Sequence, residues 1–169
     1  MNTTTQNICF VANFYRTVLY HSVALGLKKR GANVFWIAIK EKQYNYLKRH
    51  YGEQNVMLIN RDHFSKMSPP ITDLKINELV YSDRVLKYQM EDGINFLNNI
   101  QQPIYDFIHK NKISLVFGER TWAHEILIGR LLEACPQLNS AYYSFYTIRI
   151  PSERFSFFSD ERESIIKGP

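Results

Sequence analysis

The densest group of potentially reactive side chains in the sequence lies between Gly118 and Glu125. Within it, Glu119 supplies a carboxylate, Arg120 a guanidinium and His124 an imidazole, at the point where a strand pattern gives way to a helix pattern. Either Glu119 or His124 could act as a general base toward a hydroxyl nucleophile, and Arg120 could hold a phosphate or carboxylate through two parallel hydrogen bonds. The start of a helix also favours anions, because the backbone dipoles leave partial positive charge there.

The same residues also have a purely structural interpretation. Thr121 is a suitable N-cap, with Glu125 in the first turn of the helix, and the Glu-Arg pair before it could be a solvated ion pair. His124 shares a helix face with Ile128 and could simply be half-packed. The sequence leaves the catalytic and the structural interpretation open.

Three further residues are candidate substrate contacts. Asn13 and Arg16 follow the first expected strand, at the same edge of the sheet as the Glu119 region. Arg149 lies on the other side of Pro151 from Arg154, and this arginine pair could contact an acidic ligand or a partner domain. The structural alternative for each arginine is a solvated surface position.

Five apolar runs of strand length alternate with helical patterns, and this alternation predicts an α/β fold. We expect a Rossmann-like three-layer domain with a mostly parallel five-stranded sheet in the order 3-2-1-4-5. In such a sheet ligands bind at the carboxyl ends of the strands, near the point where the strand order reverses, here between the first and fourth strands. The expected strands are residues 7–13, 34–39, 55–60, 113–117 and 139–145. The first expected helix ends at Arg30, and the other three span residues 41–51, 76–110 and 121–134.

Two of the expected helices carry clear apolar stripes. Leu19, Val23 and Leu27 recur at a four-residue spacing in the first. The long stretch 76–110 has its own stripe and contains Pro103, which must kink it or start a new helix. Its stripe consists of Ile94, Leu97, Ile100, Ile104, Phe107 and Ile108.

The chain length suits one domain, which we place at residues 1–150. Residues 151–169 look like a linker or tail toward a second domain, because five strands should complete the core without them. The connection from Arg61 to Lys75 is long for a compact domain and is therefore expected to be a lid or partly disordered.

Composition excludes several classes of protein. The net charge of +5 favours anionic ligands, but no basic stripe or nucleic-acid motif is present, so no nucleic-acid partner is expected. No apolar run approaches the length of a transmembrane helix, and no secretory signal pattern opens the chain, so a cytoplasmic location is expected. Cys9 and Cys135 lack metal-type spacing and are expected to be packed thiols.

Several catalytic and cofactor motifs are absent. Neither a dinucleotide fingerprint nor a P-loop follows the first strand, so the domain is expected to bind no cofactor of its own. No nucleophile elbow and no metal triplet is visible either, and no metal site is predicted.

Three segments resemble glycosyltransferases of the GT-B type. HSVALGLKKRGANVFWIA (residues 21–38) is similar to the helix and strand that open their N-terminal domain, and ISLVFGERTWAHEILIGRLLEA (113–134) resembles a later strand-turn-helix. YSFYTIRIPSERFSFF (143–158) is similar to stretches of family members in capsular and surface-polysaccharide biosynthesis. These segments cover about a third of the chain, and the first is shared by many Rossmann-like domains.

The resemblance implies the acceptor-binding N-terminal half of a glycosyltransferase for bacterial surface polysaccharide. The acceptor would be a glycan or lipid-linked molecule, and a C-terminal domain would hold the nucleotide-sugar donor. A base at Glu119 or His124 would deprotonate the acceptor hydroxyl without an obligatory metal, and this half alone would be inactive. The resemblance also allows peripheral contact at the inner face of the membrane.

The sequence departs from the family after its first strand. Many such enzymes have a glycine-rich turn there, whereas this chain has Asn-Phe-Tyr-Arg at residues 13–16, which puts phosphate contacts by that loop in doubt. Two other hypotheses stay open: a non-catalytic Rossmann-like binding or regulatory domain, and a small unrelated α/β hydrolase or transferase.

Overall fold

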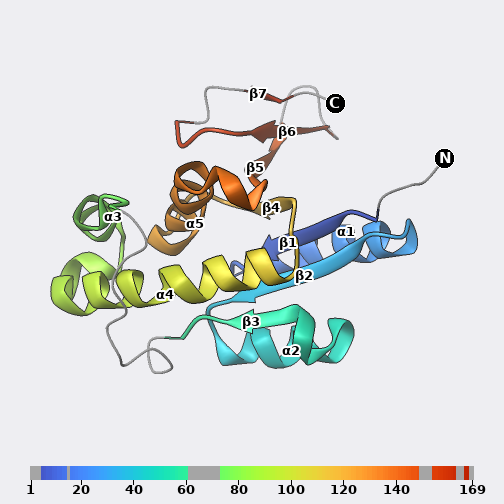
Figure 1. Cartoon of the computed structure of the whole chain (residues 1–169), viewed down its shortest axis with the longest axis horizontal. Coiled ribbons are helices and arrows are strands. Elements are labelled where there is room, and N and C mark those ends of the chain that lie inside the picture. Colours follow the sequence, from blue (N-terminus) through green and yellow to red (C-terminus); the bar gives the residue numbers. More distant parts are fainter. Residues whose placement is uncertain (1–4, 15, 61–72, 149–153, 163–165, 168–169) are drawn as a thin grey trace.

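The computed structural model describes residues 5–14, 16–60, 73–148, 154–162 and 166–167 (Figure 1). Most of the connection expected from Arg61 to Lys75 therefore lies outside the described residues. The candidate contact Arg149 lies outside them as well.

Strands and helices alternate along the chain, so the predicted α/β class is confirmed and is compatible with a Rossmann-like fold. The observed strands lie within three residues of the predicted ones at each end. The strands are β1 (Asn7–Val11), β2 (Asn33–Ala38), β3 (Val56–Leu58), β4 (Leu115–Gly118), β5 (Ala141–Ile148), β6 (Arg154–Phe158) and β7 (Ile166–Lys167). The α-helices are α1 (Arg16–Lys29), α2 (Glu41–Tyr51), α3 (Ile76–Ser82), α4 (Met90–Lys110) and α5 (Ala123–Ala134), and a 3-10 turn, η3, spans Leu86–Tyr88.

One sheet contains seven strands in the order β3-β2-β1-β4-β5-β6-β7. The five strands from β3 to β5 are parallel, whereas β6 pairs antiparallel with β5 and β7 pairs antiparallel with β6. The prediction of five strands is therefore wrong, because the sheet continues beyond β5. Its two extra strands come from the segment expected to be a linker, because the residues of β6 pair along β5 over five positions.

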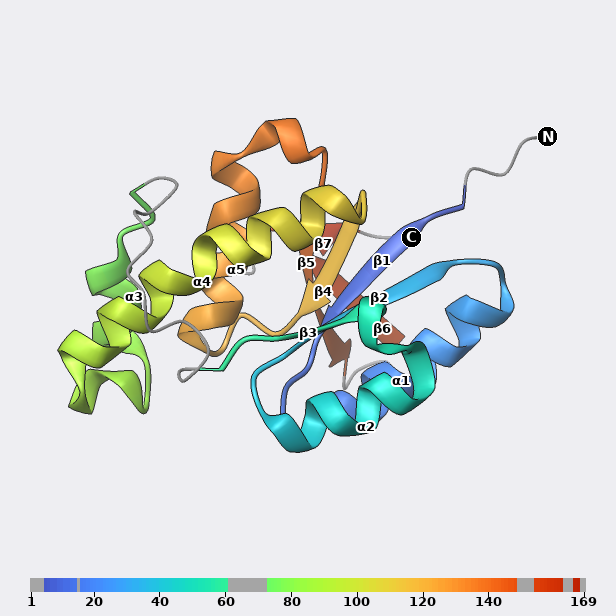
Figure 2. The same ribbon diagram turned by 60° about the horizontal axis from the view of Figure 1, so that its bottom comes forward.

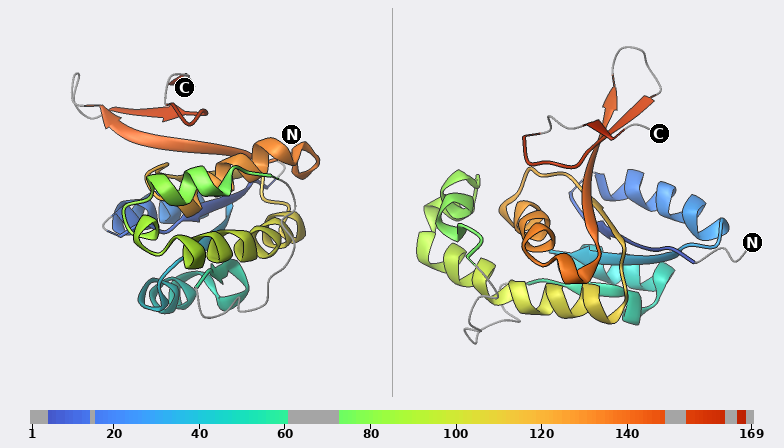
Figure 3. Two further views of the ribbon diagram at one scale, coloured as in Figure 1. Left: turned by 90° about the vertical axis from the view of Figure 1, so that its left-hand side faces the viewer. Right: turned by 45° about the horizontal axis from the view of Figure 1, so that its top comes forward.

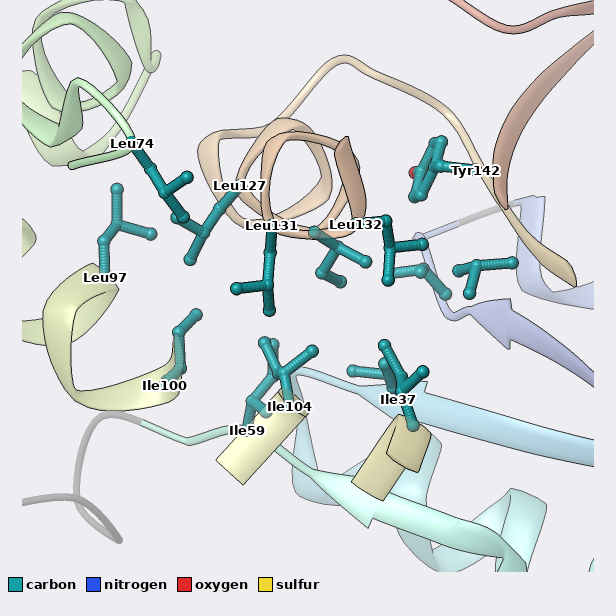
Figure 4. Close-up of a cluster of buried hydrophobic side chains, with 14 of the residues drawn as sticks. Ile37, Ile59, Leu74, Leu97, Ile100, Ile104, Leu127, Leu131, Leu132 and Tyr142 are labelled. Carbon is teal, nitrogen blue, oxygen red and sulfur yellow. The ribbon is translucent and has the colours of Figure 1, made fainter. Parts of the chain in front are cut away.

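Helices cover both faces of the parallel part of the sheet, with α1 and α2 on one side and α3, α4 and α5 on the other (Figure 2). Alternation along β1 sends Cys9 and Val11 to the α4–α5 side and Ile8 and Phe10 to the α1–α2 side. Figure 4 shows the first of these cores, in which aliphatic side chains of α4 and α5 point toward β2 and the residue that follows β3.

The stripe predicted for the long helical stretch is confirmed. Leu97, Ile100, Ile104 and Ile108 are fully buried, and the other two members pack partly buried against them. Pro103 does not start a new helix, because α4 runs unbroken across it. The break in the stretch comes earlier, between α3 and α4.

The stripe predicted for α1 is partly buried, because Leu19 and Leu27 pack against the core on its side of the sheet. Thr17, Tyr20 and Ala24 are the buried residues of this helix, whereas Val23, in the middle of the predicted stripe, is 38% exposed. The four-residue spacing therefore marks the border of the face of α1 that packs on the strands.

The cysteines and the helices bear on two further expectations. Both cysteines are buried free thiols, as predicted. In the ranges given above, no helix has the combined length and apolar character needed to cross a membrane.

Gly118 ends β4 at a point where no side chain fits. A β-carbon at this position would overlap the hydroxyl oxygen of Tyr142, which comes from the neighbouring strand β5, and would lie 3.2 Å from the β-carbon of Val11 on β1. The glycine thus lets Tyr142 cross the end of β4 beneath the loop that carries Glu119.

Replacing Gly118 by alanine should lower the free energy of unfolding by about 1–3 kcal/mol, because the added methyl group overpacks this site. Urea denaturation measures the effect, and adding Tyr142→Phe to Gly118→Ala should recover part of it. Gly26→Ala is the control, since nothing lies within 4 Å of that added methyl group. A Gly118→Ala protein as stable as the wild type would contradict this packing.

Candidate functional site

A pocket of about 280 Å³ opens at the carboxyl edge of the sheet. Its lining includes residues from the loops that follow four neighbouring strands: Phe14 after β1, Lys40 after β2, Asn60 after β3 and Trp122 after β4. The pocket therefore lies where strand order reverses, between β1 and β4, as predicted for an open α/β sheet. Its volume is close to the lower end of the range for small-molecule sites, about 300 Å³.

One wall of the pocket is aromatic. The rings of Phe14 and Trp122 lie 5.1 Å apart between centroids at a tilt of 45°. The ammonium of Lys40 lies 4.4 Å from the centre of the Phe14 ring, a cation–π contact. The loops after β1, β2 and β4 thus form one aromatic surface with the Lys40 ammonium packed on it.

His124 is the buried imidazole of this pocket. It stands in the first turn of α5, and its Nε2 atom has no hydrogen-bond partner among the described residues. Burial lowers the pKa of His124 to about 4, and the nearby Asp83 carboxylate acts in the opposite direction. The ring is therefore neutral at pH 7 and able to accept a proton or a hydrogen bond.

Asp83 joins the two sides of the pocket. Its Oδ1 atom accepts hydrogen bonds from the backbone N–H groups of Val85 (2.8 Å) and Leu86 (2.9 Å), in the turn between α3 and α4. Its Oδ2 atom accepts one from the N–H of Ala123 (2.9 Å), at the start of α5. This buried carboxylate thereby fixes the turn after α3 against the helix that carries His124.

Beneath the pocket, Asn13 bridges two buried carboxylates. Its side-chain amide nitrogen donates to Glu119 Oε2 at 2.9 Å and lies 3.3 Å from Glu125 Oε1. The Nε atom of Arg16 lies 2.5 Å from the other oxygen of Glu119, in an ion pair. The loops after β1 and β4 are therefore tied together by one amide and one guanidinium.

Glu125 caps its own helix. It accepts hydrogen bonds from the backbone N–H groups of Glu119, Thr121 and Trp122 at 3.2–3.3 Å. Burial raises the pKa of Glu125 to about 8, and the neighbouring Glu119 carboxylate adds to this, while the three N–H donors act in the opposite direction. Because Glu125 and Asp83 already accept hydrogen bonds from the first amides of α5, the chain itself fills the place expected for an anionic ligand at this helix start.

Arg120 lies outside the pocket. Its side chain is only 1% exposed and stacks on the Tyr142 ring, 5.0 Å from the guanidinium carbon to the ring centre. It donates through Nη2 to the carbonyl oxygen of Ser159, at 2.9 Å, and lies 3.6 Å from Glu133. None of these partners lines the pocket, so this guanidinium holds the turn after β6 against α5.

The structure brings together Asn13, Arg16 and Glu119 of the predicted site, and places His124 in the adjoining pocket. Sequence reasoning missed Lys40 and Asn60, although the rule that ligands bind after strand ends could have found both. It also missed Asp83, which no motif marks, because only the tertiary fold brings the turn after α3 to α5. Among the described residues, no three His, Cys, Asp or Glu side chains are grouped so that they could hold a metal ion.

Comparison of the chain with models of protein families, with curated proteins and with solved structures finds no significant match.

The raised pKa of Glu125 predicts a pH dependence of stability. An unfolded glutamate ionises near its ordinary value of 4.5, whereas folded Glu125 keeps its proton up to about pH 8. The folded state thus binds more protons between these values, and its free energy of unfolding falls as the pH rises. Above pH 6.5, where an unfolded histidine is largely neutral like buried His124, the fall to pH 8 should be about 1–2 kcal/mol.

Urea denaturation at several pH values measures this slope. Glu125→Gln removes the titrating group and should flatten the slope, even though the variant is less stable overall. An identical slope in wild type and variant would show that Glu125 is ionised throughout.

Proposed function

We propose that the chain is the acceptor-binding N-terminal half of a nucleotide-sugar-dependent glycosyltransferase in bacterial surface-polysaccharide biosynthesis. The observation that carries the proposal is the pocket at the carboxyl edge of the sheet, with its aromatic wall and a neutral imidazole whose Nε2 atom has no hydrogen-bond partner in the described part of the chain. The segments of sequence that resemble GT-B enzymes support it. In this proposal the protein acts in the cytoplasm, and the domain binds no cofactor.

The pocket suits one sugar residue of a glycan or lipid-linked acceptor. Sugars present C–H faces that pack on aromatic rings, here Phe14 and Trp122, and hydroxyl groups that need polar partners. Lys40, Asn60 and His124 provide such partners around the aromatic wall. The exposed ammonium of Lys40 would also favour an acidic sugar.

His124 is the base in this proposal. Its Nε2 atom takes the proton of an acceptor hydroxyl as that oxygen attacks the anomeric carbon of the donor sugar. The bond from that carbon to the nucleotide breaks, and the nucleotide leaves with the bonding electrons. The Asp83 carboxylate, which favours the protonated imidazole, would stabilise the charge that forms.

Glu119 is assigned a positioning role. Its two oxygens face the Asn13 amide and the Arg16 guanidinium, so the carboxylate fixes the loop after β1 against the loop after β4. The nucleotide sugar would be held by a C-terminal domain across a cleft.

A second candidate is a non-catalytic Rossmann-like domain that binds a sugar-like ligand. The pKa of His124, at about 4, favours it, because so weak a base is better suited to accept a hydrogen bond than to remove a proton. Both candidates need ligand binding in the pocket, and only the first needs His124 for turnover.

Tryptophan fluorescence tests binding, because Trp122 lines the pocket and the second tryptophan, Trp36, is fully buried. Titration of the chain with neutral hexoses, hexosamines and uronic acids should give a saturable change with at least one class. Trp122→Phe should abolish the change, with the signal of Trp36 as the internal control. No response to any class would contradict both candidates.

An assay of labelled-sugar transfer distinguishes the two candidate functions, in a protein that also carries the donor-binding domain. His124→Gln should lower kcat by at least about 100-fold and leave monosaccharide binding intact. Glu119→Gln should instead weaken binding and folding together. Unchanged turnover in His124→Gln would remove the catalytic assignment and favour the binding domain.

A further inference from the structure

The positive charge of the chain is concentrated in one segment. Residues 16–55, from the start of α1 to the turn before β3, contain eight Lys or Arg and two Glu side chains, a formal charge of +6. The other residues together carry −1, because the whole chain carries +5. The two helices of this segment, α1 and α2, cover the same face of the sheet (Figure 2). This layer therefore produces the positive field of the protein.

The outer face of α2 carries cations that no carboxylate neutralises. Lys42 and Arg49 are seven residues apart, about two helical turns, so both project from the same side of α2, with Tyr46 between them. All three side chains are exposed, that of Tyr46 to 45%. Neither cation forms an ion pair with another described residue. In both views of Figure 3, α2 lies at the end of the molecule away from β6 and β7, and no described element covers this face.

The two ends of this face are also cationic, and one of them is the pocket. Lys40, the residue before α2, lines the pocket with its ammonium against the Phe14 ring. At the other end, the ammonium of Lys28 of α1 lies 5.7 Å from the centre of the ring of Tyr51, the last residue of α2. A path of cations thus runs from the pocket along α2 to the amino edge of the sheet. We call this path, made of Lys28, Lys40, Lys42, Tyr46 and Arg49, the α2 track.

The helix dipole explains only part of this charge. Lys28 and Arg49 stand in the last turns of their helices, where partial negative charge favours cations. Lys40 and Lys42 stand at the start of α2, where the dipole disfavours a cation. Neither of these lysines forms an ion pair with the adjacent Glu41 or with any other residue in the described ranges. An anionic ligand along the helix would supply the missing negative charge.

We propose that the α2 track binds an acidic glycan, one whose sugars carry carboxylates, with the terminal sugar in the pocket. Arg49 can hold a carboxylate through two parallel hydrogen bonds, and the lysines act as point charges. The exposed ring of Tyr46 can pack on the C–H face of a sugar. Because the track is continuous with the pocket, one glycan chain would satisfy both, which favours a glycan over a nucleic acid. This inference rests on the proposed function for the sugar in the pocket, and adds that the acceptor is acidic and bound at several of its sugars.

Titration of the chain with galacturonic acid and with its linear hexamer tests the proposal, by Trp122 fluorescence and by calorimetry. The hexamer should bind at least about tenfold more tightly than the monomer, and salt should remove most of the difference. An uncharged hexamer of glucose should not bind more tightly than glucose itself. Lys42→Glu with Arg49→Glu should bring the affinity for the galacturonate hexamer down to that for the monomer and leave monomer binding unchanged.

The control is Lys110→Glu with Lys112→Glu, which changes the net charge equally at two exposed positions at the end of α4, on the other face of the sheet. It should still bind the hexamer tightly, and thermal unfolding should show that both double variants are folded. A hexamer that binds no more tightly than the monomer, or an equal loss in the control, would overturn this inference and leave the proposed function standing.

Two further outcomes are decisive. A single-stranded oligonucleotide of equal charge that displaces the hexamer and binds as tightly would overturn the inference in favour of a nucleic-acid partner. Absence of a Trp122 response to monomer and hexamer alike, while the hexamer binds by calorimetry, would contradict the sugar in the pocket and with it the inference.

Discussion

The side-chain amide of Asn13 lies between two buried carboxylates, and the carboxyl edge of the sheet is arranged around it. Glu119 and Glu125 would repel each other if both were ionised without compensation, and burial makes that repulsion stronger. Asn13 and Arg16 supply donors to Glu119, while backbone N–H groups supply them to Glu125. These bonds fix the loops after β1 and β4 side by side, and the aromatic wall of the pocket depends on that contact.

The same arrangement explains why a charged cluster in the sequence yields a mostly neutral pocket. Glu125 and Asp83 use their carboxyl oxygens to satisfy the amides at the start of α5, and Arg120 is turned toward Tyr142 and Ser159. The polar and aromatic lining consists of a neutral imidazole, three aromatic rings, an amide, a lysine and the Asp83 carboxylate, whose oxygens accept from backbone amides. Such a lining suits a ligand with apolar faces and hydroxyl groups better than it suits a bare phosphate.

The sequence was sufficient for the parallel sheet and for the edge that bears the site, because apolar runs of strand length and the position of ligands in α/β sheets are local or general rules. The sequence was insufficient where tertiary packing determines which strands pair and which side chains meet. The residues of β6 were charged and aromatic enough to look like a linker, yet they pair with β5. The α1 stripe at Leu19, Val23 and Leu27 has helical spacing, yet the spacing does not show that Val23 stays exposed. Asp83 is placed only by the fold.

The central claim is that the Asn13 bridge holds the pocket wall together, and nuclear Overhauser effects between the rings of Phe14 and Trp122 test it most directly. In the wild-type chain these contacts should be present, since the ring centroids lie 5.1 Å apart. In a folded Asn13→Ala variant they should be lost, while contacts within the core between α4 and α5 persist. Ring contacts of undiminished strength in that variant would contradict the account.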